Sequence, residues 1–160
     1  MADKAVEAVF QELGFPTARA WLPGAVAYSV ARTYNLLIRE LAQVYSRFGL
    51  TAPSFNLLML LKHGQDPEAM TQQAIGKRLV VSPSDMTGLI DRLERKGMVQ
   101  RRPGNDRRSK LLRVTAKGSR LLEEIWPQHE AMIRRLAGAL AHGEAERLVR
   151  SLAKVRKAAA

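Results

Sequence analysis

The chain has 160 residues with 26 basic and 15 acidic side chains, a formal net charge of +11 and a pI of about 10.7. This length fits one domain, or one domain with extensions, and 46% apolar residues are enough to form a core. The absence of cysteine excludes disulfides, thiolate metal sites and thiol redox sensing. No apolar run approaches the roughly 18 residues of a membrane helix, and the N-terminus lacks a signal-peptide pattern. We therefore expect a soluble, cytoplasmic protein with an anionic partner.

The positive charge is concentrated in the middle of the chain. Residues 71–114 carry 11 basic and 4 acidic side chains, a net charge of +7, whereas residues 1–50 have a net charge of only +1. A concentrated excess of this kind is typical of a surface that binds phosphate groups. The alternative is a solvated basic surface with no partner.

The first third of the chain predicts three helices. Residues 2–14 suit a short helix, and residues 25–48 repeat apolar and aromatic side chains at steps of three and four. Gly49 is placed to end that second helix. A third helix is expected over residues 55–62, after Pro53.

The middle of the chain predicts two helices followed by a β-hairpin. Thr71 is a suitable N-cap for a helix over residues 72–79. Ser82 is the next N-cap, for a helix over residues 83–96, and Asp85 stands three positions later as in a capping box. Two short strands are expected at residues 98–102 and 109–114, joined by a turn-rich tip.

Two further helices are expected after the hairpin. Thr115 caps a long helix that Pro127 should interrupt and that His142 and Gly143 should end, and a last helix covers residues 144–157. The order of elements predicts a mainly α fold with a small β-wing, in which a winged helix-turn-helix domain is flanked by long helices. These flanking helices are too long and too apolar to serve only the small domain. We divide the chain into N-terminal helices (1–52), a DNA-binding lobe (53–114) and C-terminal helices (115–160).

The predicted helix-turn-helix indicates which side chains meet DNA. Its second helix lies in the major groove, with its N-terminal N–H groups toward phosphate, and arginines at the tip of a wing can enter the minor groove. The alternative for the tip is an ordinary solvated turn. The candidate DNA-binding residues are Thr71, Lys77, Arg78, Ser82, Ser84, Thr87, Arg92, Arg95, Arg107, Arg108 and Lys110.

Five segments carry a closer resemblance. They are MTQQAIG at 70–76, VSPS at 81–84, LIDRLERKGMV at 89–99, NDRRS at 105–109 and VTAKG at 114–118. Through these five segments, the stretch from residue 53 to residue 122 resembles the MarR family of bacterial transcriptional regulators. The resemblance implies a homodimer whose two lobes read an inverted repeat in double-stranded DNA. It also implies that the terminal helices interlock, so that residues 1–52 and 115–160 are the dimerisation helices. It also implies a small anionic or aromatic effector that releases the DNA.

The resemblance assigns roles in the wing as well. It implies that Asp106 holds the wing through an ion pair with an arginine, that Arg108 enters the minor groove and that Arg107 contacts phosphate. Gly88 departs from the family pattern, where arginine, lysine or asparagine is frequent. Because Gly88 offers no side chain to a base, we expect specificity to depend on Ser84, Thr87, the wing and DNA shape.

Four residues are candidates for effector binding. Tyr28 and Arg32 share a helix face, and Trp21 precedes them by more than a turn, so the three can stack on and pair with an aromatic carboxylate. The alternative, packing against the dimer mate, is the commoner role for such residues. His63 is a fourth candidate, and the alternative is that it is an ordinary surface histidine. The three histidines have no partners at metal-ligand spacing, so we expect neither metal nor cofactor.

These observations favour a sequence-specific DNA-binding regulator, most simply a homodimeric repressor released by a ligand. The alternative is a nonspecific or architectural DNA-binding protein, suggested by the high pI and the basic C-terminal helix. That helix also suits a membrane surface, although a dimer interface explains its apolar face better. We expect no enzyme, since the sequence has no phosphate loop and no nucleophile paired with a base.

Overall fold

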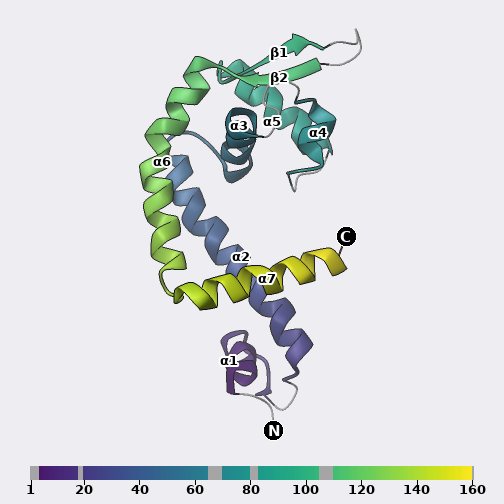
Figure 1. Cartoon of the computed structure of the whole chain (residues 1–160), viewed down its shortest axis with the longest axis vertical. Helices are drawn as coiled ribbons and strands as arrows, with labels where there is room; N and C mark the ends of the chain where they lie inside the picture. Colours follow the sequence, from purple (N-terminus) through teal and green to yellow (C-terminus); the bar gives the residue numbers. More distant parts are fainter. Residues whose placement is uncertain (1–3, 18–19, 65–69, 80–82, 105–109, 160) are drawn as a thin grey trace. The chain divides into compact units, whose positions relative to one another are not determined.

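The computed structural model describes residues 4–17, 20–64, 70–79, 83–104 and 110–159 (Figure 1). It consists of two compact units, Met1–Gln43 and Val44–Ala160, whose boundary lies within the helix α2. Within the described ranges the fold is mainly helical with one two-stranded antiparallel sheet, which confirms the predicted fold class. Among these helices, none combines the length and the hydropathy needed to cross a membrane.

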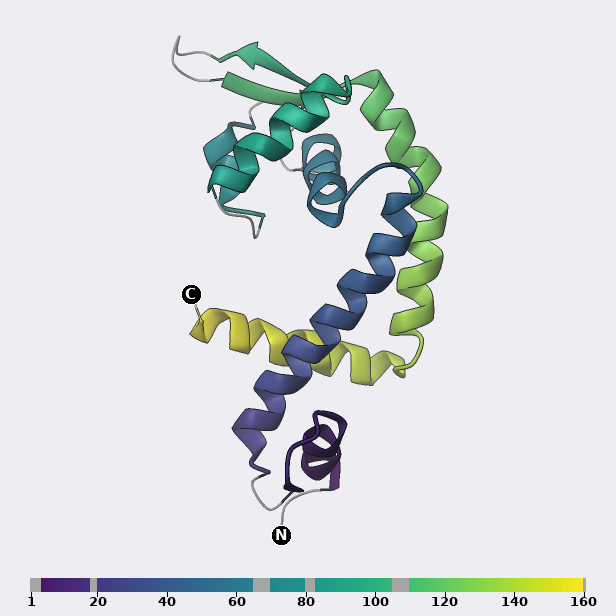
Figure 2. The same ribbon diagram turned by 180° about the vertical axis from the view of Figure 1, so that it is seen from behind.

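The first unit is a helical hairpin made by α1 (Lys4–Glu12) and most of α2 (Leu22–Ser46). Val6 and Phe10 of α1 are buried together with Ala25 of α2. The ring of Phe10 meets that of Tyr28 edge-on, with centroids 5.7 Å apart. The apolar stripe of the short N-terminal helix therefore buries against α2, as its helical spacing requires. Figure 2 shows α1 beside the N-terminal end of α2.

The second unit contains a lobe built around α3 (Ala52–His63). The lobe also includes α4 (Gln72–Gly76), α5 (Pro83–Arg95), β1 (Val99–Pro103) and β2 (Lys110–Val114). Thr51 caps α3 by accepting a hydrogen bond from the backbone N–H of Ser54. The buried side chains of the lobe come from every element: Phe55, Leu57, Leu58, Leu61, Ile75, Met86, Leu89, Ile90, Leu93, Val99 and Leu112.

The sheet ties the first helix of the helix-turn-helix to the wing. Val99 of β1 lies opposite Val114 of β2, and Pro103 lies opposite Lys110. The backbone N–H of Leu112 in turn donates to the carbonyl of Met70 at 2.8 Å, directly before α4. The chain turns from α5 into β1 through Gly97, whose φ of 68° favours glycine.

Two sequence predictions about the last helices are wrong. The helix α6 (Ala116–Ala137) is continuous through Pro127, and it ends at Ala137 rather than at His142. Pro127 and Glu123, four residues earlier, are both exposed, so the carbonyl group that loses its partner lies on a side that water reaches. Buried side chains before and after the proline, Ile125 and Met132, hold the helix in one piece.

The true end of α6 is at Gly138, whose backbone N–H caps the helix by donating to the carbonyl of Arg134. The helix α7 (His142–Ala158) then begins two residues earlier than predicted. Glu144 accounts for that early start, because its side chain accepts a hydrogen bond from the backbone N–H of Ala141 at 2.9 Å. The residues expected to separate the helices, His142 and Gly143, form the first turn of α7 instead.

Candidate DNA-binding surface

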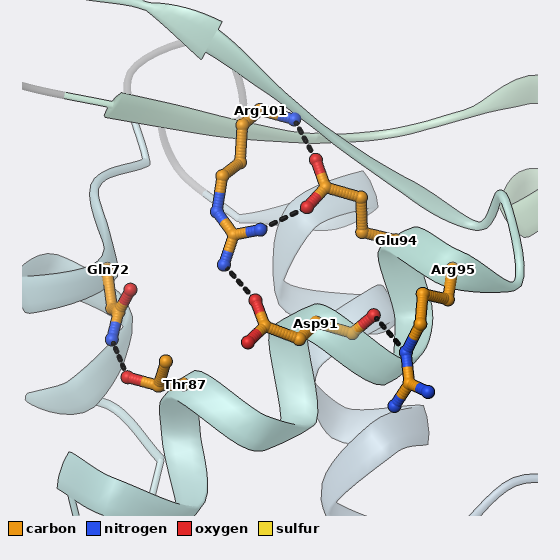
Figure 3. A network of polar contacts seen from close by, with 6 residues as sticks. All are labelled: Gln72, Thr87, Asp91, Glu94, Arg95 and Arg101. Atoms are coloured by element: carbon orange, nitrogen blue, oxygen red, sulfur yellow. Dashed lines mark hydrogen bonds and ion pairs between the residues drawn. The ribbon is translucent and has the colours of Figure 1, made fainter.

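The helices α4 and α5 are joined by polar contacts at their N-terminal ends. Thr71 caps α4 by accepting a hydrogen bond from the backbone N–H of Ala74 at 3.1 Å, as its position predicts. The side-chain amide of Gln72 donates to the hydroxyl of Thr87 at 2.8 Å (Figure 3). Thr87 is exposed on α5, so its hydroxyl is oriented by α4 and still reachable from outside.

Five of the predicted cations are exposed on the lobe. Lys77 and Arg78 follow α4, Arg92 and Arg95 lie on α5, and Lys110 begins β2. Two of the arginines donate hydrogen bonds to main-chain carbonyl groups of their own helices: Arg78 to Ala74 at 3.2 Å and Arg95 to Asp91 at 3.4 Å. Because both acceptors are main-chain carbonyl groups, these two bonds do not use up the positive charge of the guanidinium groups.

Gly88 lies on α5 in open surroundings. A Cβ atom built there meets only the end of the flexible Arg92 side chain, 3.7 Å away. The glycine is therefore not required by close packing, and a methyl group fits at this position.

Arg101 of β1 pairs with two carboxylates of α5 and compensates half of their negative charge. Its guanidinium forms ion pairs with both Asp91 and Glu94, and its backbone N–H donates to Glu94 at 3.3 Å (Figure 3). The hydrogen bond to Asp91 and the attraction of Glu94 raise the pKa of Arg101 above its ordinary value, against the opposing effect of burial. We call this set of contacts the Arg101 clamp; it fixes β1 on α5.

A second group of contacts fixes the C-terminal end of α5. The ammonium of Lys117 donates to the carbonyl of Lys96 at 2.8 Å, and the hydroxyl of Thr115 donates to the carbonyl of Gly97 at 2.7 Å. Cations are favourable at this end of a helix, where carbonyl groups lack partners. Gly118 allows the close approach, because a Cβ atom there would lie 2.4 Å from the carbonyl oxygen of Met98.

Several predicted contacts lie outside the described residues. These are Ser82, Asp106, Arg107 and Arg108, together with the side chain of Ser84, which belongs to the first turn of α5. The ion pair expected of Asp106 therefore stays a prediction. Sequence reasoning missed the Arg101 clamp, although two carboxylates three residues apart on α5 and an arginine on the next strand were a usable signal.

The candidate effector residues are divided between the two units. Tyr28 packs against Phe10 of α1 and against Phe15, which follows α1, with ring centroids 5.7 Å apart in both pairs. Arg32 pairs with Glu12 at 3.1 Å. Trp21 is 58% exposed, and its indole lies so close to the backbone of Gly24 that a Cβ atom there would be 2.6 Å from the ring nitrogen. His63 belongs to the other unit, at the C-terminal end of α3.

His63 lines a groove of about 550 Å³ between α3 and α6. The groove is bordered by Met59, Lys62, His63, Leu122, Glu123, Trp126 and Pro127. The ammonium of Lys62 crosses from α3 to α6 and pairs with Glu123 at 2.7 Å. This hydrogen bond and the charge of Lys62 lower the pKa of the Glu123 carboxyl.

Beside this groove, three aromatic rings form a stack. The ring of Tyr45 lies 4.3 Å from that of Phe55 and 6.0 Å from that of His129, and the Tyr45 hydroxyl is 2.9 Å from Nδ1 of His129. Burial raises the pKa of Tyr45 and lowers that of His129. The stack joins the end of α2 to α3 and α6. No group of three potential metal ligands occurs in the part of the chain that is described.

Comparison with known proteins places these observations in a family. A model of the MarR family matches residues 50–110. The HTH-type transcriptional regulator PecS of Dickeya dadantii (strain 3937) is 29% identical over 136 residues, which cover 84% of this chain and 82% of PecS. The crystal structure of Sco5413, a MarR family transcriptional regulator from Streptomyces coelicolor, is 31% identical, with a TM-score of 0.75 and coverage of 87% of this chain and 96% of Sco5413.

A further solved structure is that of BpsR from Bordetella bronchiseptica, whose DNA binding is regulated by 6-hydroxynicotinic acid. BpsR is 26% identical to this chain, with a TM-score of 0.72, and the match covers 82% of this chain and 98% of BpsR.

Proposed function

Because the chain belongs to the MarR family of transcriptional regulators, which bind DNA and are not enzymes, we propose that it is a homodimeric repressor released by a small ligand. The observation that carries the proposal is the lobe of residues 53–114, where exposed cations directly after α4, on α5 and on β2 accompany the Arg101 clamp. The clamp compensates part of the negative charge of Asp91 and Glu94, which would otherwise repel phosphate.

In this proposal α5 enters the major groove and the wing follows the adjacent minor groove. Thr87, held by Gln72, and Ser84 face the base edges, while Ser82 and Thr71 lie at the helix N-termini close to phosphate. The cations Lys77, Arg78, Arg95 and Lys110 contact phosphates. Arg108 enters the minor groove, Arg107 contacts a neighbouring phosphate, and Asp106 stabilises the wing.

Residues 1–52 and 115–160 form the dimer in this proposal. None of the side chains of α7 is buried, although the helix carries the apolar residues Leu148, Val149 and Val155, which are 44–63% exposed. An amphipathic helix of this length gains stability by covering its apolar face, and a second copy of the chain does so symmetrically. Two recognition helices then read an inverted repeat with half-sites about 10 bp apart.

The ligand in the proposal is a small aromatic or anionic molecule. BpsR supports this class, since an aromatic acid regulates its DNA binding. In this chain Trp21, Tyr28, Arg32 and His63 stay the predicted contacts. Tyr28 and Arg32 already bind α1, so a ligand at these residues has to compete with Phe15 and Glu12.

A competition assay tests the proposal. Genomic fragments, including the DNA that flanks the protein's own gene, are selected for binding, and each is compared with a scrambled duplex at two salt concentrations. We expect a preference of at least about 1,000-fold for the selected site. Equal binding of the selected and scrambled duplexes, with the same steep salt dependence, rejects a specific regulator.

That negative result would favour a nonspecific DNA-binding protein. The exposed basic residues of α7 favour this second candidate: Arg147, Arg150, Lys154, Arg156 and Lys157. An Arg108→Ala variant further tests the proposed specific mode of DNA binding. It should lose about 1–3 kcal/mol of binding free energy if Arg108 occupies the minor groove.

A further inference from the structure

Gly88 lies in the middle of the outward face of α5. The buried residues of this helix form one stripe, and the helical rotation of about 100° per residue places Gly88 on the opposite side of the helix. The members of that stripe are Met86, Leu89, Ile90 and Leu93. Because α5 enters the major groove in the proposed function, the helix has a gap where its outward face meets the base edges.

The guanidinium of Arg92 lies over this gap. Its Nη1 atom is 3.7 Å from the place that a Cβ atom of Gly88 would occupy. Long side chains on a helix point toward the N-terminus, so Arg92 covers the turn that precedes its own Cα atom. A long side chain at position 88 would compete for the same space. The glycine therefore lets Arg92 reach the N-terminal half of α5, the part of a recognition helix that contacts base edges.

The guanidinium of Arg92 is also available to a ligand from outside. Its side chain is exposed, and no carboxylate among the described residues pairs with it. The nearest carboxylates in sequence, Asp91 and Glu94, are bound by Arg101. By contrast, the guanidinium of Arg95 donates to the carbonyl of Asp91 at 3.4 Å. Arg92 is thus an arginine of α5 that can turn toward DNA without giving up a contact to a described residue.

A guanidinium at such a place matches one base. It donates two parallel hydrogen bonds to O6 and N7 of guanine, and no other base presents this pair of acceptors in the major groove. We propose that Arg92, lying across Gly88, reads a guanine in each half-site of the DNA. This inference rests on the proposed function and adds a specificity-determining residue to it.

Selection of random duplexes by the full chain supplies the DNA for the test. The enriched sequences should share a G·C pair at one position of each half-site. Replacing these guanines by 7-deazaguanine removes the N7 acceptor and keeps the base pairs. The dissociation constant should then rise by about 5- to 150-fold, the range for loss of a bidentate contact. The same replacement in the spacer between the half-sites should change it by less than about twofold.

An Arg92→Met variant assigns the guanine to its residue. The readout is the deaza ratio, defined as the dissociation constant of the modified duplex divided by that of the unmodified duplex. Arg92→Met should bring this ratio to within about twofold of unity, because the group that contacts N7 is gone. Arg95→Met is the matched control, since it removes another exposed arginine of α5. It should weaken binding to both duplexes alike and keep the wild-type ratio.

Substitutions of Gly88 test whether the gap is required. Gly88→Ala adds a methyl group that leaves Arg92 in ordinary contact at 3.7 Å, so the deaza ratio should persist. Gly88→Leu fills the space that the guanidinium occupies. It should bring the ratio to within about twofold of unity although Arg92 is still present.

Several results overturn the inference and leave a specific regulator in place, because sequences are still enriched. They are a selected site without a shared G·C pair, a wild-type deaza ratio near unity, and a wild-type ratio in Arg92→Met or in Gly88→Leu. Loss of the ratio in Arg95→Met also overturns it, since the reading would then not belong to Arg92. If no sequence is enriched at all, the proposed function fails and the inference fails with it.

Discussion

Replacing Arg101 by methionine tests whether the Arg101 clamp holds the wing. The substitution keeps an unbranched side chain and removes the cation that joins β1 to Asp91 and Glu94. The side chains of Arg101, Asp91 and Glu94 are 24%, 48% and 38% exposed, so water screens both ion pairs. Each ion pair then contributes about 0.2–1 kcal/mol to the free energy of unfolding. Because the hydrogen bonds of the clamp are lost with the ion pairs, the substitution should lower the free energy of unfolding by about 1–2 kcal/mol.

Urea unfolding followed by circular dichroism measures this loss. Arg102→Met is the matched control, because Arg102 is the next residue of β1 and is exposed. The control should change the free energy of unfolding by less than about 0.5 kcal/mol. Equal stability of the Arg101→Met and Arg102→Met variants would refute the assigned role of the clamp.

The salt dependence of DNA binding distinguishes a residue that positions the wing from a residue that contacts phosphate. If Arg101 acts only by positioning the wing, Arg101→Met weakens binding while the slope of log K against log salt stays the same. Arg95→Met, which removes a proposed phosphate contact, should reduce the slope by about 0.9. A reduced slope in Arg101→Met would instead make Arg101 a phosphate contact, with its ion pairs open in the complex.

Three other substitutions have clear expected outcomes. Gly118→Ala should destabilise the chain by about 1–3 kcal/mol in thermal unfolding, because its Cβ atom would meet the carbonyl oxygen of Met98 at 2.4 Å; wild-type stability would contradict that contact. Gly88→Ala should raise the stability by up to about 1 kcal/mol, since the site is open and alanine favours the helix; a loss of stability would show that the space is filled. Burial lowers the pKa of His129 in the folded state, so the unfolded chain binds the proton first and the free energy of unfolding should decline as the pH falls below 6.5. His129→Gln should flatten this decline in urea titrations between pH 7 and pH 5, and an equally steep decline in the variant would assign it to other groups.

The fold class and the family were predictable because the signals are local. Helix caps such as Thr71 and Thr115 and the glycines that end α2 and α5 stand where the structure uses them. The boundaries of α6 and α7 were not predictable from the same rules. Pro127 signals a break, and only the buried contacts on both sides of it keep the helix continuous.

The candidate site was also predictable only in part. The helical spacing of the residues predicts which cations are exposed on one face of a helix, and the structure places Arg92 and Arg95 on that face. The Arg101 clamp joins side chains 7 residues apart, and the carboxylates of α5 followed by an arginine on the next strand were a signal for it. The Lys62–Glu123 pair joins side chains 61 residues apart, which no local pattern specifies. Tyr28 illustrates the limit of face assignment: helical spacing identifies its face, but not that α1 packs on it.

The most direct test of the central claim is the spacing of the half-sites in a selected DNA site. If two copies of α5 read successive major grooves of an inverted repeat, inserting about 5 bp between the half-sites moves one of them to the opposite side of the duplex. We predict that this insertion lowers the affinity to that of scrambled DNA, while base changes in the spacer that keep its length have much smaller effects. Undiminished binding after the insertion would contradict a two-fold repressor and indicate that each lobe binds alone.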